Sequence, residues 1–163
     1  LRYLDRYLLV KQGEVFYITE ALAVLEGLER GPAGNTSLTA AFALAQTMDR
    51  DHFIVVQETE YTGAGKHPLP QISFAKQNGI EILFGDPDTE VPGKNIVFPD
   101  SPERIRLRDF DLAKARTSYI RNSVTQAKRE SISKEDLAFL AAETKSDENF
   151  VLGVLKELNV SVK

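Results

Sequence analysis

The sequence contains no cysteine, and its single methionine is Met48. The lack of cysteine excludes disulfide bridges, thiolate zinc ligands and cysteine nucleophiles within these 163 residues. Histidine is scarce as well: His52 and His67, placed as they are and without clustered carboxylates, do not predict a metal site. Positive charge is not in excess, since the formal net charge is -4 at pH 7. Such a chain does not favour broad binding to nucleic acid or to membrane surfaces.

Long apolar runs and targeting signals are also missing. No apolar run approaches the ~20 residues of a membrane-spanning helix. The N-terminus has no signal-peptide pattern, so we expect a cytoplasmic location. The length allows one domain with a hydrophobic core. Because the chain opens at Leu1 and has no methionine before Met48, we expect it to be a piece of a longer chain, with residues essential for chemistry outside it.

The first hundred residues alternate between helix and strand patterns, which favours an α/β domain. Thr19 suits a helix N-cap, and Pro68 and Pro70 limit the helix near them to residues after the second proline. Apolar spacing predicts helices at residues 1–9, 21–28, 38–48 and 71–78, and strands at residues 14–18, 52–56, 80–84 and 95–98.

The last sixty residues show helical patterns and no strand signal. We expect helices at residues 111–128, 134–144 and 149–158. Ser133 and Asp136 have the spacing of a capping box, and Ser146 or Asp147 suits the N-cap of the last helix. We therefore divide the chain into an α/β part, residues 1–102, and a helical extension, residues 103–163.

The stretch that organises the chain is residues 57–68. It follows the apolar run at residues 52–56 and contains the turn Thr62-Gly63-Ala64-Gly65-Lys66. Glycines let the backbone approach a ligand closely, and the end of a strand offers unpaired N–H groups. The spacing is not that of a Walker A loop, and the third glycine of a dinucleotide fingerprint is missing. On spacing alone, the turn fits either a planar or anionic ligand or a purely structural role.

Other polar residues are weaker candidates, and each has a structural alternative. Glu58 and Glu60 lie on one face of an extended segment and fit either an acid–base pair or solvated carboxylates. His67 and Lys66 sit in the turn, where they fit either ligand contacts or surface residues. A modest basic cluster fits either a solvated face or a site for an acidic ligand, and consists of Arg104, Arg106, Arg108, Arg116 and Arg121.

Three features read in order are more specific than any one alone. They are residues 15–22, then Leu25-Glu26-Gly27 with the alanine-rich residues 37–45, and finally residues 54–56 with the Thr62-to-Lys66 turn. In this order they resemble the C-terminal part of the fold-type-II pyridoxal-phosphate enzymes of the tryptophan-synthase-β and threonine-synthase type. In that family a Glu-Gly element precedes a small-residue helix, and a later strand ends in a hydroxyl- and glycine-containing turn.

The resemblance implies that residues 1–102 are part of the large α/β domain of such an enzyme, followed by a helical tail. It implies that Thr62 hydrogen-bonds the pyridine nitrogen of pyridoxal 5'-phosphate, that Gly63 lets the backbone lie close to the ring, and that Glu26 lies near the ring edge. A neutral hydroxyl partner tempers the ring as an electron sink. The Schiff-base lysine and the phosphate loop lie in the N-terminal portion of this family. We therefore assign no catalytic residue within this chain.

Within the family, residues 57–68 and Gly79-Ile80-Glu81-Ile82 resemble a thiolase branch of ornithine degradation. That resemblance implies cleavage of 2-amino-4-oxopentanoate by coenzyme A, giving acetyl-CoA and alanine. It also implies a small α subunit as partner and a homodimer of the β chain. Two alternatives stay open: another lyase or synthase of the same fold, and a non-catalytic α/β binding domain with a helical interaction tail.

Overall fold

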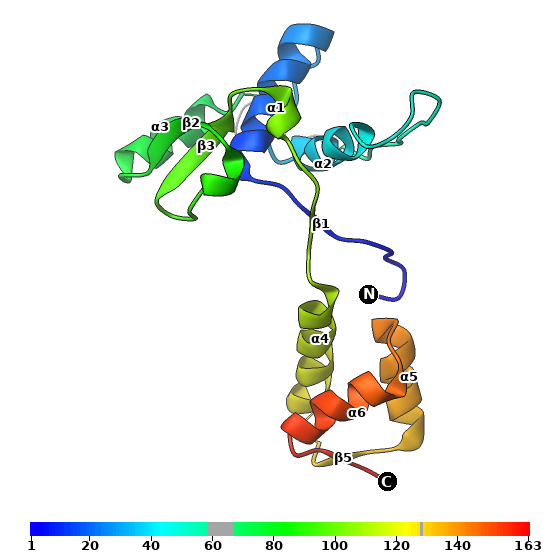
Figure 1. Cartoon of the computed structure of the whole chain (residues 1–163). Coiled ribbons are helices and arrows are strands. Elements are labelled where there is room, and N and C mark those ends of the chain that lie inside the picture. The colour runs from blue at the N-terminus through cyan, green and yellow to red at the C-terminus, as the bar shows by residue number, and fades with distance from the viewer. Residues whose placement is uncertain (59–66, 128) are drawn as a thin grey trace. The chain divides into compact units, whose positions relative to one another are not determined.

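The computed structural model describes residues 1–58, 67–127 and 129–163, and it is a mixed α/β structure (Figure 1). The chain divides into two compact units. Leu8–Arg108 is called here the helix–sheet unit, and Leu1–Tyr7 with Asp109–Lys163 is called the tail unit. Within the described ranges, no helix has both the length and the apolar character needed to cross a bilayer. The division of the chain at residue 102 into an α/β part and a helical extension stays a prediction.

The helix–sheet unit is built on two parallel strands, β2 (Glu81–Gly85) and β3 (Asn95–Pro99). Their register runs from Glu81 opposite Asn95 to Gly85 opposite Pro99. Its helices are α1 (Gln12–Glu26), α2 (Asn35–Ala45) and α3 (Leu69–Gln77), and its short elements are β1 (Leu8–Leu9) and the 3₁₀ turns Pro87–Thr89 and Pro102–Arg104. The two-residue strand β4 (Arg108–Asp109) stands where the sequence passes from one unit to the other.

Two apolar clusters hold this unit together. Phe16 and Ala75 pack with Ile96, which joins α1 and α3 to the sheet. Ile18 and Ala43 join α1 to α2 in a second cluster, together with Ile105. The start of α1 lies directly on the sheet. A Cβ at position 13 would meet the Val97 carbonyl oxygen at 1.9 Å, so only glycine fits there.

The strand predicted at residues 14–18 is wrong, because these residues lie in the first half of α1. Their composition favours a strand, but strand propensity yields to tertiary packing. Val15, Phe16 and Ile18 are all buried. Thr19, predicted to cap a helix, lies inside α1 and donates its hydroxyl hydrogen to the Val15 carbonyl oxygen at 2.8 Å. The N-cap position is Lys11, and the Glu14 carboxylate reaches back to accept the Lys11 backbone N–H at 2.7 Å.

The strand predicted at residues 52–56 is also wrong, since residues 52–58 have no regular structure. A strand needs a partner to take its backbone hydrogen bonds, and none of the described strands pairs with this segment. It runs out and back after α2 in Figure 1, with Phe53 and Val55 exposed. The helix predicted at residues 1–9 is absent as well, because Tyr3 and Leu4 are exposed and so short a helix is not stable alone.

The remaining elements of this unit agree with the sequence. α3, β2 and β3 lie within about two residues of their predicted bounds. Gly79 follows α3 with a φ of 74°, and the Ile80 N–H donates to the Ala75 carbonyl oxygen at 2.9 Å, which closes the helix. One detail differs: α3 begins at Leu69 and contains Pro70, because a proline in the first turn removes no helical hydrogen bond.

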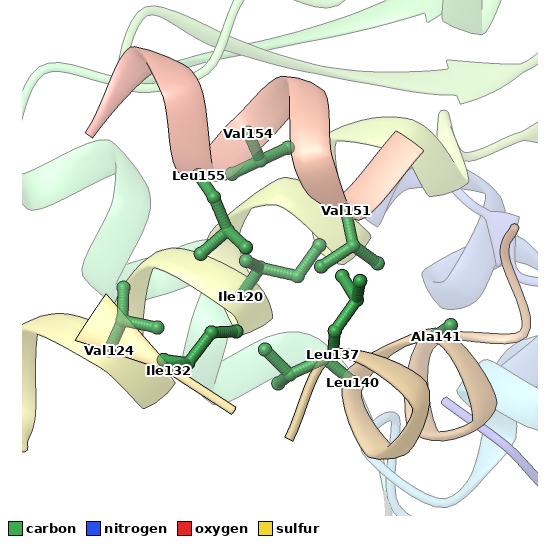
Figure 2. Packing of buried hydrophobic residues seen from close by; sticks show 9 residues of the cluster. All are labelled: Ile120, Val124, Ile132, Leu137, Leu140, Ala141, Val151, Val154 and Leu155. Atoms are coloured by element: carbon green, nitrogen blue, oxygen red, sulfur yellow. The ribbon is translucent and has the colours of Figure 1, made fainter. Parts of the chain in front are cut away.

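The tail unit is helical, as predicted, with α4 (Leu112–Gln126), α5 (Lys134–Thr144) and α6 (Glu148–Glu157). Its core is a single cluster of apolar side chains from all three helices, drawn in Figure 2: Ile120, Val124, Ile132, Leu137, Leu140, Ala141, Val151, Val154 and Leu155. The N-caps are formed as expected. The Asp136 N–H donates to the Ser133 hydroxyl at 3.0 Å, and the Phe150 N–H donates to the Asp147 carboxylate at 2.7 Å.

The prediction of a tail without strands is wrong in one detail. β5 (Ser131–Ile132) and β6 (Ser161–Val162) form a two-residue parallel pair. So short a pair has no periodicity that a sequence pattern could reveal. It brings Ile132 into the apolar cluster and fixes the end of the chain beside the loop that precedes α5.

Candidate functional site

The residues predicted to hold the cofactor fall in two places. Thr62 and Gly63 lie outside the described residues. Glu26 is the last residue of α1, and its side chain is exposed. Gly27 follows with a φ of 66° and ends the helix in the left-handed conformation. Glu26 therefore stands at the point where the chain leaves α1, and its role at the cofactor stays a prediction.

The residues just before the Thr-Gly-Ala-Gly-Lys turn lie against the loop after α1 and the first turn of α2. The Ser37 hydroxyl donates to the Gln57 carbonyl oxygen at 2.8 Å. Arg30 Nε lies 3.9 Å from Glu58 Oε2, a contact that joins the loop to the approach of the turn. The other oxygen of this carboxylate, Oε1, is buried and has no hydrogen-bond partner among the described residues.

The residue just after the turn, His67, lies beside two carboxylates of the same region. Its Nδ1 is 3.3 Å from Glu20 Oε1 on α1, and its Nε2 is 3.8 Å from Glu29 Oε1 in the following loop. All three side chains are about half exposed. The structure thus places Glu58 and His67, the described residues nearest the turn on either side, beside the second half of α1 and its loop, where Glu26 also lies.

Asn35 is a buried polar residue of a type that is common at helix N-caps. It is the first residue of α2 and is completely buried. Its Nδ2 donates to the Thr19 hydroxyl at 3.0 Å, and the Thr39 hydroxyl donates to its carbonyl oxygen at 2.7 Å. Its side-chain Oδ1 has no partner in the described part of the chain. A buried acceptor without a donor is costly, so this atom is a candidate ligand contact.

No sequence signal distinguished Asn35 from its neighbours. Asn35, Thr36 and Ser37 are all good N-cap types, and the pattern alone allowed any of them to cap α2. In the structure none does, because the N-cap position is Gly34 and no side chain caps the helix. The burial of Asn35 follows from the packing of α1 on α2, which is a tertiary feature.

The basic cluster at residues 104–108 is an ion-pair network. Arg104 and Arg106 contact the Asp86 carboxylate at 3.1 and 3.2 Å. Arg108 reaches Asp88, and its Nη1 donates to both oxygens of Glu14 at 2.9 and 2.8 Å. Glu14 is fully buried, so this last pair is the interior part of the network. The contacts of these three arginines are therefore those of a structural ion-pair network.

The network also sets the acidity of its carboxyl groups. The hydrogen bond from Arg108 holds the pKa of Asp88 below its ordinary value. The backbone N–H of Asp88, followed by the charge of Arg106, lowers the pKa of Asp86. The lowered pKa of each carboxyl group favours its ionised form, which holds the arginines.

The remaining candidates do not form a chemical site. His52 is exposed, and its Nδ1 lies 3.3 Å from the Asp49 carbonyl oxygen. Glu60 and Lys66 lie outside the described residues. The Arg116 Nε donates to the Thr144 carbonyl oxygen at 2.9 Å, which is a contact within the tail unit. In the described ranges, no three histidine, aspartate or glutamate side chains are grouped so that they could hold a metal ion.

Comparison with known proteins identifies relatives along nearly the whole chain. A 2-amino-4-ketopentanoate thiolase beta subunit from Acetoanaerobium sticklandii is 57% identical over 158 residues, which is 97% of this chain. A protein of the same name from an unidentified prokaryote is 56% identical over 160 residues, or 98% of this chain. The chain is homologous to part of the 2-amino-4-ketopentanoate thiolase beta subunit.

The match covers 34% of the length of each thiolase beta subunit, so the chain spans about a third of the relatives it matches. The name of these relatives implies an alpha subunit as their partner. No family model and no solved structure matches the chain. The resemblance drawn from residues 57–68 is thereby confirmed at the level of homology to the thiolase beta subunit.

Proposed function

We propose that this chain forms part of a pyridoxal-phosphate-dependent thiolase beta subunit. The reaction is the cleavage of 2-amino-4-oxopentanoate, which is the same compound as 2-amino-4-ketopentanoate, by coenzyme A to acetyl-CoA and alanine. The partners are a thiolase alpha subunit and a second copy of the beta chain. The observation that carries the proposal is the 56–57% identity to thiolase beta subunits over almost the entire chain.

Pyridoxal phosphate, when bound, supplies an electron sink for the electron pair left as the carbon–carbon bond breaks. This chain would form one wall of the pocket. The Thr62 hydroxyl would hold the pyridine nitrogen by a hydrogen bond, Gly63 would leave room for the ring, and Glu26 would stand near the ring edge. The contacts of Glu58 and His67 with the end of α1 and its loop support this arrangement, because they bring the described residues on either side of the turn to the region of Glu26.

Asn35 gives a second reason to expect that the cofactor and substrate bind beside α1 and α2. Its buried Oδ1 needs a hydrogen-bond donor, and the charged, polar groups of a cofactor-bound amino acid carry such donors. Its Nδ2 is held by Thr19 on α1, so the acceptor is fixed in orientation. We therefore include Asn35 among the residues that line the bound substrate and cofactor.

The decisive experiment uses the full-length beta subunit, loaded with pyridoxal phosphate and mixed with its alpha subunit. We expect acetyl-CoA and alanine in equal amounts when 2-amino-4-oxopentanoate and coenzyme A are both present, and neither when coenzyme A is omitted. A loaded complex that forms no acetyl-CoA contradicts the thiolase reaction. Ammonia release or side-chain replacement on serine or threonine would instead support another lyase or synthase of the same fold.

Thr62→Ala tests the assignment of the turn. Loss of one buried hydrogen bond to the ring costs about 1.5 kcal/mol, so turnover should fall about tenfold, and the absorption band of the bound cofactor should shift. Thr59→Ala is the matched control, because it removes a hydroxyl three residues earlier. If Thr62→Ala leaves both spectrum and turnover unchanged, Thr62 does not face the ring.

A further inference from the structure

Several large apolar side chains of the helix–sheet unit lie on its surface. On α1, Val24 and Leu25 are 78% and 77% exposed. On β2, Phe84 is 77% exposed, and its ring lies 5.5 Å from that of Phe98 on β3. Val24, Leu25 and Phe98 line a hollow of about 370 Å³ beside α1, whose walls are mainly apolar atoms. We call Val24 and Leu25 the outer face of α1. In Figure 1 the second half of α1 stands clear of the sheet.

The segment after α2 also exposes large apolar side chains, but it does so within an extended stretch of chain. Phe53 and Val55 are 95% and 96% exposed, whereas Ile54 and Val56 are half-buried. In an extended chain alternate residues point to opposite sides, so this segment carries apolar side chains on both faces. That pattern is typical of a strand covered on both faces, in the interior of an α/β domain. A surface that a separate subunit covers needs only one apolar face.

The homology indicates what covers these surfaces. The chain corresponds to 34% of the length of the thiolase beta subunits, and the match includes nearly all of its own residues. About two thirds of the homologous polypeptide therefore lies outside the described structure. A segment buried on both faces needs neighbours on each side of it, and the rest of the same polypeptide is long enough to supply them.

We propose that residues 53–55 and the outer face of α1 are covered by the part of the same beta-subunit polypeptide that has no counterpart in this chain. The alpha subunit and a second beta chain are the competing occupants. The proposal rests on the homology and on the exposed residues, and it does not depend on the reaction. Failure of the thiolase assay would therefore leave it standing, and its own failure would leave the reaction untouched.

Thiol labelling of the full-length beta subunit tests this directly, because the 163 residues contain no cysteine of their own. Val55→Cys and Val24→Cys report on the two surfaces. Phe139→Cys is the exposed control, since Phe139 is 59% exposed on α5. Each labelled peptide is identified by mass spectrometry, which separates it from native cysteines elsewhere. Each rate is divided by the rate in urea, which removes intrinsic differences in reactivity.

We expect Val55→Cys and Val24→Cys to react at least about tenfold more slowly than Phe139→Cys, because a covered residue reacts only through local opening. The rates should not change with dilution or with added alpha subunit. Protection that requires the alpha subunit, or that disappears on dilution, overturns the proposal in favour of another occupant. Fast reaction under all conditions overturns it outright.

A second measurement guards against variants that fail to fold. Hydrogen exchange of the unmodified full-length beta subunit reports on backbone amides in residues 20–26 and 52–57. We expect these amides to be protected in the isolated subunit at low concentration. Residues 52–57 make no strand pairing in the described structure, so their protection requires new hydrogen-bond partners. Complete exchange within seconds contradicts the proposal.

Discussion

The helix–sheet unit and the tail unit bury their apolar residues to very different extents. In the tail, α4, α5 and α6 enclose one continuous cluster, and Ile120 and Val151 are completely buried. In the helix–sheet unit, two smaller clusters lie beside large exposed apolar side chains such as Phe53 and Val55. The difference teaches that the tail has an enclosed core of its own, whereas the helix–sheet unit carries the exposed apolar side chains on which the proposed cover by further polypeptide rests.

The largest predicted effect concerns the buried ion pair of the helix–sheet unit. Glu14→Gln removes the charge that faces Arg108 in the interior, and breaking a buried ion pair costs about 3–5 kcal/mol. Native-state hydrogen exchange of α1 and β3 peptides in the full-length subunit measures the loss. Asp109→Asn is the control, because it breaks an exposed, solvent-screened pair with Arg6 and should have a much smaller effect. Equal effects for both variants would mean that Glu14 does not anchor this unit.

The second prediction examines the core of the tail. Ile120→Ala leaves a cavity where all three helices meet, and we expect a loss of about 2–5 kcal/mol. Because the tail has a core of its own, the loss should appear in peptides of α4 to α6 and leave α1 and β3 unchanged. Leu152→Ala, at a partly exposed position on α6, is the control and should have a small effect. A loss spread equally over both units would remove the contrast between them.

The third prediction concerns the start of α5. Ser133→Ala removes the side chain that accepts the Asp136 N–H, and we expect a loss of about 1 kcal/mol in tail stability. Ser118→Ala, at an exposed position within α4, is the matched control and should be close to neutral. Urea unfolding followed by exchange of α5 amides provides the measurement. If the two variants behave alike, the capping box contributes nothing to the tail.

The smallest effect is a dependence on pH. The folded state lowers the pKa of Asp88 through Arg108, so its stabilising contribution is complete above the ordinary aspartate pKa of about 3.9. The contribution is lost as the pH falls through the lower pKa of the folded state. We expect α1 and β3 amides to lose protection below about pH 4, and to lose less in Asp88→Asn.

The tail offers the matched comparison for this pH dependence. The backbone N–H of Ser133, its hydroxyl and Arg129 lower the pKa of Asp136, so the same sign applies there. Asp136→Asn should therefore change the acid response of α5 and leave that of α1 as it is. An acid response in the helix–sheet unit that Asp88→Asn does not alter would exclude the ion-pair network as its cause.

The elements that the sequence predicted well are those with strong local signals. The tail helices have caps at Asp111, Ser133 and Asp147, and their apolar positions face one cluster. Gly79 lies just before β2 and Gly85 is its last residue, so a glycine marks each end of the strand. In these places propensity, caps and burial agree, which is why the sequence is sufficient there.

The failures lie where the deciding contact is distant in sequence. Residues 14–18 look like a strand, but Glu14 pairs with Arg108, and Val15 to Ile18 pack as a helix against the rest of the unit. Asn35 was indistinguishable from other cap residues until its burial against α1 was known. Residues 52–56 have the composition of a strand, but none of the described strands lies beside them to take their backbone hydrogen bonds.

The most direct test of the contrast between the units compares two isolated pieces, residues 8–108 and residues 109–163, by heteronuclear NMR and urea unfolding. The tail piece should give dispersed amide resonances and one cooperative transition, because its apolar core is complete. The helix–sheet piece should give broad resonances or associate, because its apolar faces have no cover. A monomeric, well-dispersed spectrum from residues 8–108, together with an unfolded tail piece, would contradict the account.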